Sequence, residues 1–285
     1  MPVPNDPGRV TPIPEERESQ SVYYRSRLKI YPQGGRELMI AKKTTFTPGS
    51  NADQKRPQKK KQNVTVGSDI VAAKDYTPDE AASASACFDR AMRRARARVR
   101  DIALSNPFSH FVTLTLAPDQ VDRYDPVAIG KRLRVWLDNQ VRRKGLCYVL
   151  VPERHKDGAI HYHGFFNDAL TYTDSGHKDD KGHPIFNIPA WTFGFTTAIP
   201  IYGNYPQAVS YVCKYIGKQG EKIGGRWYLS GGSLQGPEIQ YGVYEDWEEG
   251  MYAMEEIAAK NCSKVYRFKI EEIGNEIGII RVNME

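Results

Sequence analysis

Two histidines two residues apart, with a carboxylate eight residues before the first of them, form the most informative group in this sequence. His161 and His163 share one face if they lie on a β-strand, because alternate residues of a strand point to the same side. The intervening Lys156-Asp157-Gly158 is a typical turn sequence, so the chain is predicted to fold back as a hairpin. Glu153 would then lie across from the two histidines. Two imidazoles and one carboxylate suit a divalent cation.

This ligand set does not name a reaction. The same three side chains suit Mg²⁺ or Mn²⁺, and also Zn²⁺ or a non-haem iron. A His-x-His pair on a strand can also be no more than two ordinary polar residues. The facing carboxylate and the apolar residues on either side of the turn favour a metal site.

A second group of reactive side chains falls in the segment after Pro206, which is predicted to be a helix over about residues 206–218. Tyr211 and Tyr215 are four residues apart and therefore share a helix face, and Lys214 and Lys218 follow the same spacing. A tyrosine can act as a covalent nucleophile. A divalent cation and a nearby ammonium would favour its attack on phosphorus. In the alternative interpretation, both tyrosines only anchor the helix to a sheet.

A third segment, residues 111–116, alternates apolar residues with Thr113 and Thr115 and is predicted to be a central strand, in which the threonines serve structure rather than catalysis. The order of this strand, the His-x-His strand and the Tyr-x-x-Lys-Tyr helix resembles the HUH endonucleases that start rolling-circle replication. The paired tyrosines resemble those of the twin-tyrosine initiators of small single-stranded DNA phages. Residues 108–164 are most similar to replication-associated proteins of phages, prophages and plasmids of Gram-positive bacteria.

The resemblance, which covers roughly residues 91–234, implies a metal-dependent DNA endonuclease and strand transferase. It implies that Mg²⁺ or Mn²⁺ is held on the scissile phosphate by Glu153, His161 and His163. Tyr211 would attack the phosphorus, form a 5′-phosphotyrosine and free a 3′-hydroxyl. Tyr215 would be a second nucleophile, and Lys214 would stabilise charge on the phosphate. The implied partners are single-stranded DNA at a replication origin, a host helicase and a DNA polymerase.

The formal net charge of +6 suits a polyanionic partner, although many proteins are equally basic. The distribution of the charge is more informative, because a strongly basic helix precedes the first motif. Each basic run could be a solvated face, but beside a nuclease site phosphate contacts are the better interpretation. The predicted DNA-binding residues are Arg93, Arg94, Arg96, Arg98, Arg100 and Lys218.

The predicted fold class is α+β: an antiparallel sheet with helices packed on one face. The resemblance makes this a HUH/Rep-type core, of the ferredoxin- or RRM-like split β-α-β kind, with N- and C-terminal appendages. Residues 1–78 are expected to be mostly disordered or extended, with a possible hairpin at 21–43. Residues 79–235 would form the endonuclease domain, and 236–285 a C-terminal helix and hairpin. Residues 168–184 are expected to be a polar loop with exposed histidines.

Several classes of protein are disfavoured. The four cysteines are far apart in the sequence, which argues against a thiolate zinc site or a disulfide framework. No apolar stretch approaches a membrane span and no signal-peptide core begins the sequence, so a cytoplasmic location in a bacterial host cell is expected. No phosphate-cradling loop for ATP is present, so strand separation would depend on the partner helicase.

Three other functions remain open at this point. A transposase or relaxase shares the histidine and tyrosine chemistry. A non-catalytic, basic nucleic-acid-binding protein would use the arginine-rich helix alone, with structural histidines. A metal oxygenase could be built on the two histidines and Glu153, and it would give Tyr211 and Lys214 no role.

Overall fold

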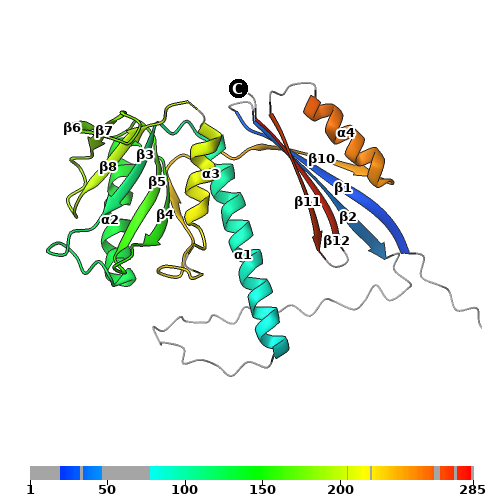
Figure 1. The fold of residues 1–285 in the computed structure, drawn as a ribbon, viewed down its shortest axis with the longest axis horizontal. Helices are drawn as coiled ribbons and strands as arrows, with labels where there is room; N and C mark the ends of the chain where they lie inside the picture. The colour runs from blue at the N-terminus through cyan, green and yellow to red at the C-terminus, as the bar shows by residue number, and fades with distance from the viewer. Residues whose placement is uncertain are drawn as a thin grey trace, which may run out of the picture.

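The computed structural model describes residues 20–32, 35–46, 78–203, 205–218, 220–259, 264–272 and 275–283. Within these ranges the chain forms two antiparallel sheets and four helices (Figure 1). This arrangement confirms the predicted α+β class. The helices are α1 (Pro78–Ser105), α2 (Pro126–Lys144), α3 (Tyr205–Tyr215) and α4 (Trp247–Ala259).

The larger sheet has seven strands in the order β6-β7-β8-β3-β5-β4-β9. Strand β3 lies at its centre and pairs with β5 on one side and β8 on the other, both antiparallel. The predicted central strand and the predicted hairpin around Asp157-Gly158 are confirmed. The strands are β3 (His110–Thr115), β4 (Tyr148–Arg154), β5 (Ile160–Phe166), β6 (Thr173–Lys178), β7 (Pro184–Asn187), β8 (Thr196–Pro200) and β9 (Leu229–Gly231).

Helices cover both faces of this sheet, so the prediction of helices on one face is wrong. Leu133 and Leu137 of α2 pack with Leu150 on one side of β4. On the other side, α1 and α3 pack against Val149 and Val151. The physical reason is that β4 begins with five consecutive buried residues, and a continuous apolar run needs cover on both faces.

Capping residues mark both ends of helix α2. The Asp125 side chain accepts a hydrogen bond from the Val127 amide at 2.8 Å, and Pro126 occupies the first turn, where it sacrifices no backbone hydrogen bond. Gly145 ends the helix in the left-handed conformation, with φ of 72°. The three basic residues of the last turn complement the negative end of the helix dipole.

The second sheet joins segments from near both ends of the chain, in the order β10-β1-β2-β12-β11. A hairpin of β1 and β2 pairs with β10 along one edge and with β12 along the other. Helix α4 covers this sheet through Met254, which packs on Leu38 and Ile40. The strands are β1 (Gln20–Ile30), β2 (Arg36–Phe46), β10 (Glu238–Tyr244), β11 (Lys264–Glu272) and β12 (Asn275–Asn283).

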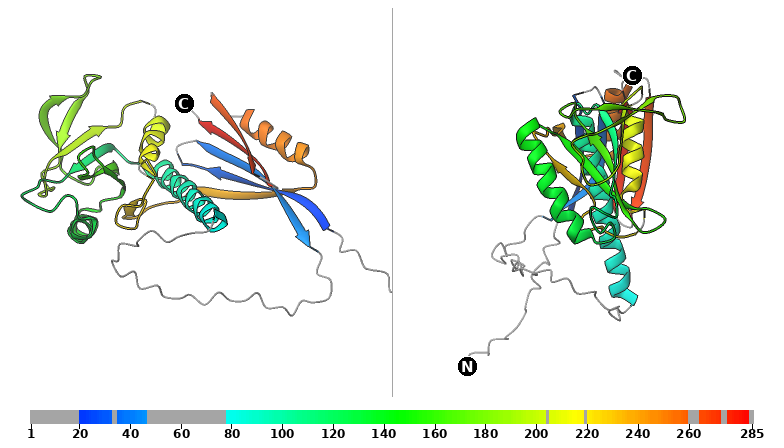
Figure 2. Two further views of the ribbon diagram at one scale, coloured as in Figure 1. Left: turned by 60° about the horizontal axis from the view of Figure 1, so that its bottom comes forward. Right: turned by 90° about the vertical axis from the view of Figure 1, so that its left-hand side faces the viewer.

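Helix α1 lies between the two sheets, as the views in Figures 1 and 2 show. It meets the second sheet through a buried polar cluster. The Lys29 ammonium lies 2.8 Å from Asp101 of α1 and 3.2 Å from Glu37 of β2. The Tyr31 hydroxyl donates a further hydrogen bond to Asp101 at 2.9 Å. The proposed division into domains stays a prediction.

Residues 168–184 form more regular structure than the polar loop that was expected. Strands β6 and β7 pair with a bulge between Asp174 and His177 and extend the edge of the large sheet. Strand β6 was not predicted because its residues are polar and show no two-residue alternation of apolar side chains. His177 is exposed, as expected. His183 was also expected to be exposed but is half-buried, and its ring stacks on the Tyr202 ring with centroids 4.4 Å apart.

The expectation that residues 1–78 are mostly disordered or extended falls outside the described residues over 1–19 and 47–77. Strand β2 itself extends to Phe46, beyond the predicted hairpin end at residue 43. Among the described helices, none is both long enough and apolar enough to span a bilayer.

Candidate active site

The hairpin of β4 and β5 places the carboxylate and the histidines side by side. Glu153 of β4 lies directly opposite His161 of β5, and Thr115 of β3 flanks His161 on the other side. His163, two residues further along β5, has Thr113 of β3 as its neighbour. Both histidines are partly exposed on the sheet face that α3 shares. The three predicted metal-binding residues therefore share one face of the sheet.

Hydroxyl groups from β3 hold both imidazole rings. The Thr113 hydroxyl lies 3.1 Å from Nδ1 of His163, and the Thr115 hydroxyl lies 3.4 Å from Nδ1 of His161. A hydroxyl can donate to or accept from a ring nitrogen, so it orients the ring in either tautomer. The sequence interpretation gave these threonines a structural role only. Their two-residue spacing, which matches that of the histidines, is the signal that could have revealed the pairing.

Glu153 is engaged by two neighbours. One carboxylate oxygen contacts Nε2 of His163 at 2.8 Å, and the other accepts a hydrogen bond from the Lys218 ammonium at 2.6 Å. Lys218 was predicted to contact DNA and is found instead beside the carboxylate. Its hydrogen bond to Glu153 raises the pKa of the Lys218 ammonium. Burial lowers the pKa of both His161 and His163, which favours the neutral ring that a metal requires.

The donor chemistry suits a divalent cation, but the side chains are not gathered around one point. Within the described part of the chain, no group of three or more His, Cys, Asp or Glu side chains is arranged to hold a metal ion. Glu153 and His163 are instead in direct contact with each other. In favour of a cation, each imidazole has its Nδ1 atom hydrogen-bonded to a partner, as metal-ligating histidines almost always do.

The tyrosine helix lies against the histidine strand. The Tyr215 ring stacks on the His163 ring, with centroids 4.3 Å apart and planes 10° from parallel. The Tyr215 hydroxyl donates a hydrogen bond to the Tyr211 hydroxyl at 2.6 Å. Tyr211 remains half exposed to solvent. Burial, and then the contact with Tyr211, raises the pKa of Tyr215 above its ordinary value.

The opposite side of α3 fixes the position of these phenols. Val209, Val212 and Cys213 are buried against α1 and the sheet. After the helix, Gly217 adopts a φ of +77°, and the Met92 sulfur of α1 occupies the place that a β-carbon would take. Only glycine satisfies both conditions, so α1 and the end of α3 pack in direct contact.

The predicted DNA-binding arginines do not share one environment. Arg93, Arg94 and Arg98 are exposed on α1, whereas Arg96 and Arg100 are partly buried. Lys214, predicted to act in catalysis, is exposed on α3. It is therefore Lys218, rather than Lys214, that lies beside the carboxylate.

One further histidine, which the sequence interpretation left without a role, joins the site. His155, in the turn between β4 and β5, stacks on His161 with centroids 5.2 Å apart. Its Nδ1 atom lies 3.3 Å from the carboxylate of Asp157. No spacing rule pointed to this residue, because the turn brings it back over the strand.

Residues 109–220 match the family model for the replication-associated protein ORF2/G2P. The matched span is 112 of the 285 residues and contains β3, the β4–β5 hairpin and α3. It therefore includes the carboxylate, the histidines, their threonine partners and the two tyrosines, whereas the arginines of α1 lie before it. Comparison of the chain with curated proteins and with solved structures found no match. The family match associates this part of the chain with DNA replication.

Proposed function

We propose that the chain nicks and rejoins single-stranded DNA to initiate rolling-circle replication, through a covalent 5′-phosphotyrosine intermediate. One contact carries the proposal: the Tyr215 ring stacks on His163 while its hydroxyl reaches Tyr211. This contact puts two phenolic oxygens beside a cluster of two imidazoles and a carboxylate. The family match supports the replication role, and the chemistry is inferred from the side chains.

In the proposed reaction, the Tyr211 oxygen forms a bond to the scissile phosphorus and the phenolic proton leaves. The bond from phosphorus to the 3′ oxygen breaks, and that oxygen takes up a proton to become a free 3′-hydroxyl. Tyr211 suits this step because it is half exposed. The hydrogen bond that Tyr215 donates would stabilise the negative charge that develops on the Tyr211 oxygen.

Glu153, His161 and His163 would hold Mg²⁺ or Mn²⁺, which when bound would polarise the scissile phosphate. For the three ligands to converge, Glu153 must exchange its contacts with His163 and Lys218. The Lys218 side chain is 59% exposed, and apart from Glu153 it contacts the face of the Tyr215 ring, with its ammonium 5.5 Å from the ring centroid, so among the described residues its displacement would break only these two contacts. Thr113 and Thr115 would keep the imidazole rings oriented during this exchange.

The roles of the remaining predicted residues follow from their positions. Tyr215 would serve as the second nucleophile after one round of replication, when Tyr211 is linked to DNA. Lys214 would act on the phosphate only if DNA approaches the exposed side of α3. The exposed arginines of α1, together with Lys218, would contact backbone phosphates. The partners would be origin DNA, a helicase and a polymerase in the cytoplasm of a bacterial host.

A non-catalytic nucleic-acid-binding protein is the second candidate, and one observation favours it. Glu153 is paired with Lys218 and His163, which is how a purely structural carboxylate would be satisfied. Such a protein would bind DNA without ever linking to it. A transposase or relaxase would link to DNA as the initiator does and would differ only in the strand it joins.

A covalent adduct separates the proposed nicking enzyme from the non-catalytic DNA-binding protein. The protein is incubated with a labelled single-stranded oligonucleotide pool and Mn²⁺, and the mixture is resolved in SDS. We expect a labelled band at the size of the protein–DNA conjugate, lost in Tyr211→Phe and in the presence of EDTA. Tyr228→Phe, a change at a partly buried tyrosine outside α3, is the matched control and should keep the band. Binding without any adduct in the unaltered protein would establish the second candidate.

A further inference from the structure

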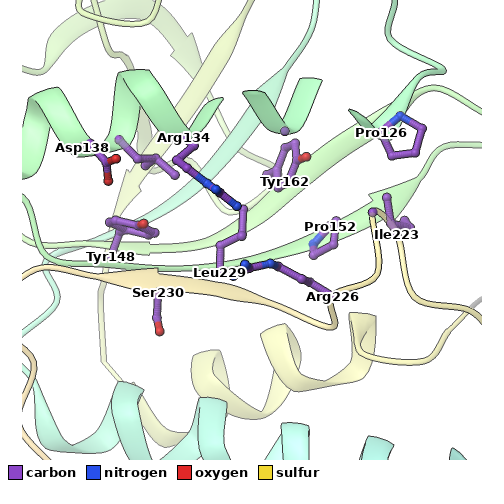
Figure 3. Close-up of a pocket in the computed structure, with 13 residues that line it drawn as sticks. Pro126, Arg134, Asp138, Tyr148, Pro152, Tyr162, Ile223, Arg226, Leu229 and Ser230 are labelled. Carbon is purple, nitrogen blue, oxygen red and sulfur yellow. The ribbon is translucent and has the colours of Figure 1, made fainter. Parts of the chain in front are cut away.

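A polar cavity lies on the reverse face of the strands that carry the proposed active site. It has a volume of 230 Å³ and lies between α2, strands β4 and β9, and the segment before β9 (Figure 3). Pro152 and Tyr162 line it from the sheet. Each precedes a proposed metal ligand in the chain, so each points to the opposite side. The two sites are therefore back to back on the same strands.

Two arginines from different elements meet in this cavity. Arg134 comes from α2 and Arg226 from the segment before β9, and Figure 3 shows both side chains extending toward the middle of the cavity. Both arginines are exposed to solvent, and within the part of the chain that the structure describes neither guanidinium forms an ion pair or a side-chain hydrogen bond. Asp138 is the one carboxylate in the lining, so two cations and one anion leave a net charge of +1. An anion that enters the cavity could bind both guanidinium groups through charge-assisted hydrogen bonds.

The rest of the lining is aromatic and apolar. Tyr148 is 8% exposed and Tyr162 is 4% exposed, and within the described residues neither hydroxyl has a hydrogen-bond partner. Burial raises the pKa of Tyr162 to about 12, so this hydroxyl stays protonated and can donate. Leu137, Pro152 and Leu229 complete the apolar walls. Two phenols that face the cavity beside apolar walls fit a flat ring that carries hydrogen-bonding edges.

A tight turn holds the backbone of the loop that carries Arg226. Gly224 and Gly225 have φ of +58° and +72°, which is the geometry of a tight type I′ turn. The Arg226 amide closes this turn on the Ile223 carbonyl at 3.2 Å. Ile223 itself is buried in the core beside α2. The backbone of Arg226 is therefore held in one position at the rim of the cavity.

We propose that this cavity binds a single nucleotide unit, with its phosphate on Arg134 and Arg226 and its base between the tyrosines and the apolar walls. The volume lies below the range of about 300–1,000 Å³ that is usual for ligand pockets, so the cavity can take at most one nucleotide unit and not an extended strand. The nucleotide could be free or part of a DNA strand that passes the edge of the sheet. The proposal is independent of the nicking reaction, because no residue of the cavity takes part in it.

Binding of deoxyadenosine monophosphate to the full chain tests the proposal by titration calorimetry. Deoxyadenosine and inorganic phosphate, added separately, should each bind at least about tenfold more weakly, because each makes only part of the contacts. Arg134→Gln and Arg226→Gln should each weaken nucleotide binding by about tenfold or more. Arg143→Gln, which removes an exposed arginine of the same helix, should leave binding unchanged.

Filling the cavity supplies a test that leaves its charges intact. A β-carbon added at Gly130 meets no atom within 4 Å, so Gly130→Leu can be accommodated in α2 and would occupy the cavity. This variant should lose nucleotide binding and keep its thermal stability. Unchanged affinity in Gly130→Leu, or in both arginine variants, would overturn the proposal.

Binding of an oligonucleotide distinguishes a free nucleotide from a nucleotide that is part of a DNA strand. The measurement uses the Tyr211→Phe variant, in which no covalent link to DNA forms. If a short deoxyadenosine oligomer loses about tenfold in affinity on adding Arg226→Gln, the ligand is a nucleotide of DNA. If only the monophosphate is affected, the cavity binds a free nucleotide. If neither ligand responds, the cavity has no such role, and the nicking reaction can still hold because its adduct assay is separate.

Discussion

Arg96 of α1 holds the end of the tyrosine helix through the carbonyl of Ile216. Its Nε and Nη2 atoms donate hydrogen bonds to that oxygen at 3.1 and 2.7 Å. Such a contact satisfies one of the carbonyls that a helix end leaves without a partner. It also fixes the direction of the segment that continues to Lys218. Arg96, which was predicted to bind DNA, therefore donates its hydrogen bonds to another part of the protein.

Replacing Arg96 should separate positioning from DNA binding. In Arg96→Ala, the rate of adduct formation at saturating DNA should fall by roughly tenfold, because the tyrosine helix loses a charge-assisted hydrogen bond. The DNA dissociation constant should change little. Arg98→Ala, at an exposed position on the same helix, should show the reverse pattern. Gel-shift titration and adduct kinetics measure the two quantities, and identical profiles for both variants would remove the positioning role.

The two tyrosines should differ in the first nicking step. Tyr211→Phe should abolish the adduct, whereas Tyr215→Phe should slow it by on the order of tenfold to a hundredfold. The second change keeps the ring that stacks on His163 and removes only the hydrogen bond donated to Tyr211. The measurement is the initial rate of adduct formation on one oligonucleotide. Complete loss in Tyr215→Phe alone would reverse the order of the two nucleophiles.

The histidines and their threonine partners should act on cleavage rather than on DNA binding. His161→Ala should abolish nicking and leave DNA affinity within about twofold, since binding depends mainly on phosphate contacts. Thr113→Val should raise the Mn²⁺ concentration needed for half-maximal nicking by about 10- to 100-fold, because it removes the partner of His163 Nδ1. Thr197→Val, at the exposed residue opposite Thr113 on β8, is the control. Equal loss of binding and nicking in His161→Ala would mean that this residue supports the fold.

The contact between the second sheet and α1 should be costly to break. Asp101→Ala removes one partner of Lys29, which is 3% exposed, and leaves its ammonium with Glu37 alone. Loss of one partner of a buried charge typically costs about 3–5 kcal/mol, and the remaining pair places the expectation near the lower value. Urea unfolding measures the change. Asp119→Ala, at an exposed site, should change the free energy of unfolding by less than about 0.5 kcal/mol.

Stability should fall at acidic pH through a buried histidine far from the proposed nucleophiles. Burial lowers the pKa of His110 from its ordinary value of 6.5. The His110 ring stacks on the Tyr172 ring, with centroids 3.7 Å apart. The unfolded chain therefore binds more protons than the folded chain as the pH falls through about 6.5. The free energy of unfolding should be level above that pH and should decrease below it. His161 and His163, whose pKa values are also lowered, contribute in the same direction.

His110→Gln tests this assignment by the slope of stability against pH. The slope below pH 6.5 should become smaller, while His177→Gln, at an exposed ring, should leave it unchanged. Urea unfolding at pH 5.5 and pH 7.5 gives the two values for each variant. The assignment to His110 is wrong if both variants keep the slope of the unaltered protein.

Local sequence patterns were sufficient for the elements that carry the proposed chemistry. The turn at Asp157-Gly158 and the two-residue period of His161 and His163 predicted the hairpin with its facing carboxylate, and the register confirms it. The four-residue spacing of Tyr211 and Tyr215 predicted a shared helix face, on which the two hydroxyls are found in contact. These relationships depend only on backbone periodicity and turn chemistry, which residues close in sequence control.

Contacts between distant segments required the tertiary structure. The partnership of Lys218 with Glu153 joins residues 65 positions apart, and the contact of Arg96 with Ile216 spans 120 positions. Nothing in a basic side chain distinguishes a DNA contact from an internal one. Whether a basic side chain contacts DNA or the protein depends on its surroundings, and here the packing of α1 and α3 on the sheet determines those surroundings.

The sequence by itself determined the α+β class, the hairpin, the tyrosine helix and the types of side chain at the site. The tertiary structure alone decided that helices cover both sheet faces and that the strands near the two ends form one sheet. It also decided that Thr113 and Thr115 hold the histidines. The reason is physical: periodicity reports which face of an element is apolar, whereas the partner of that face is selected by packing across the whole chain.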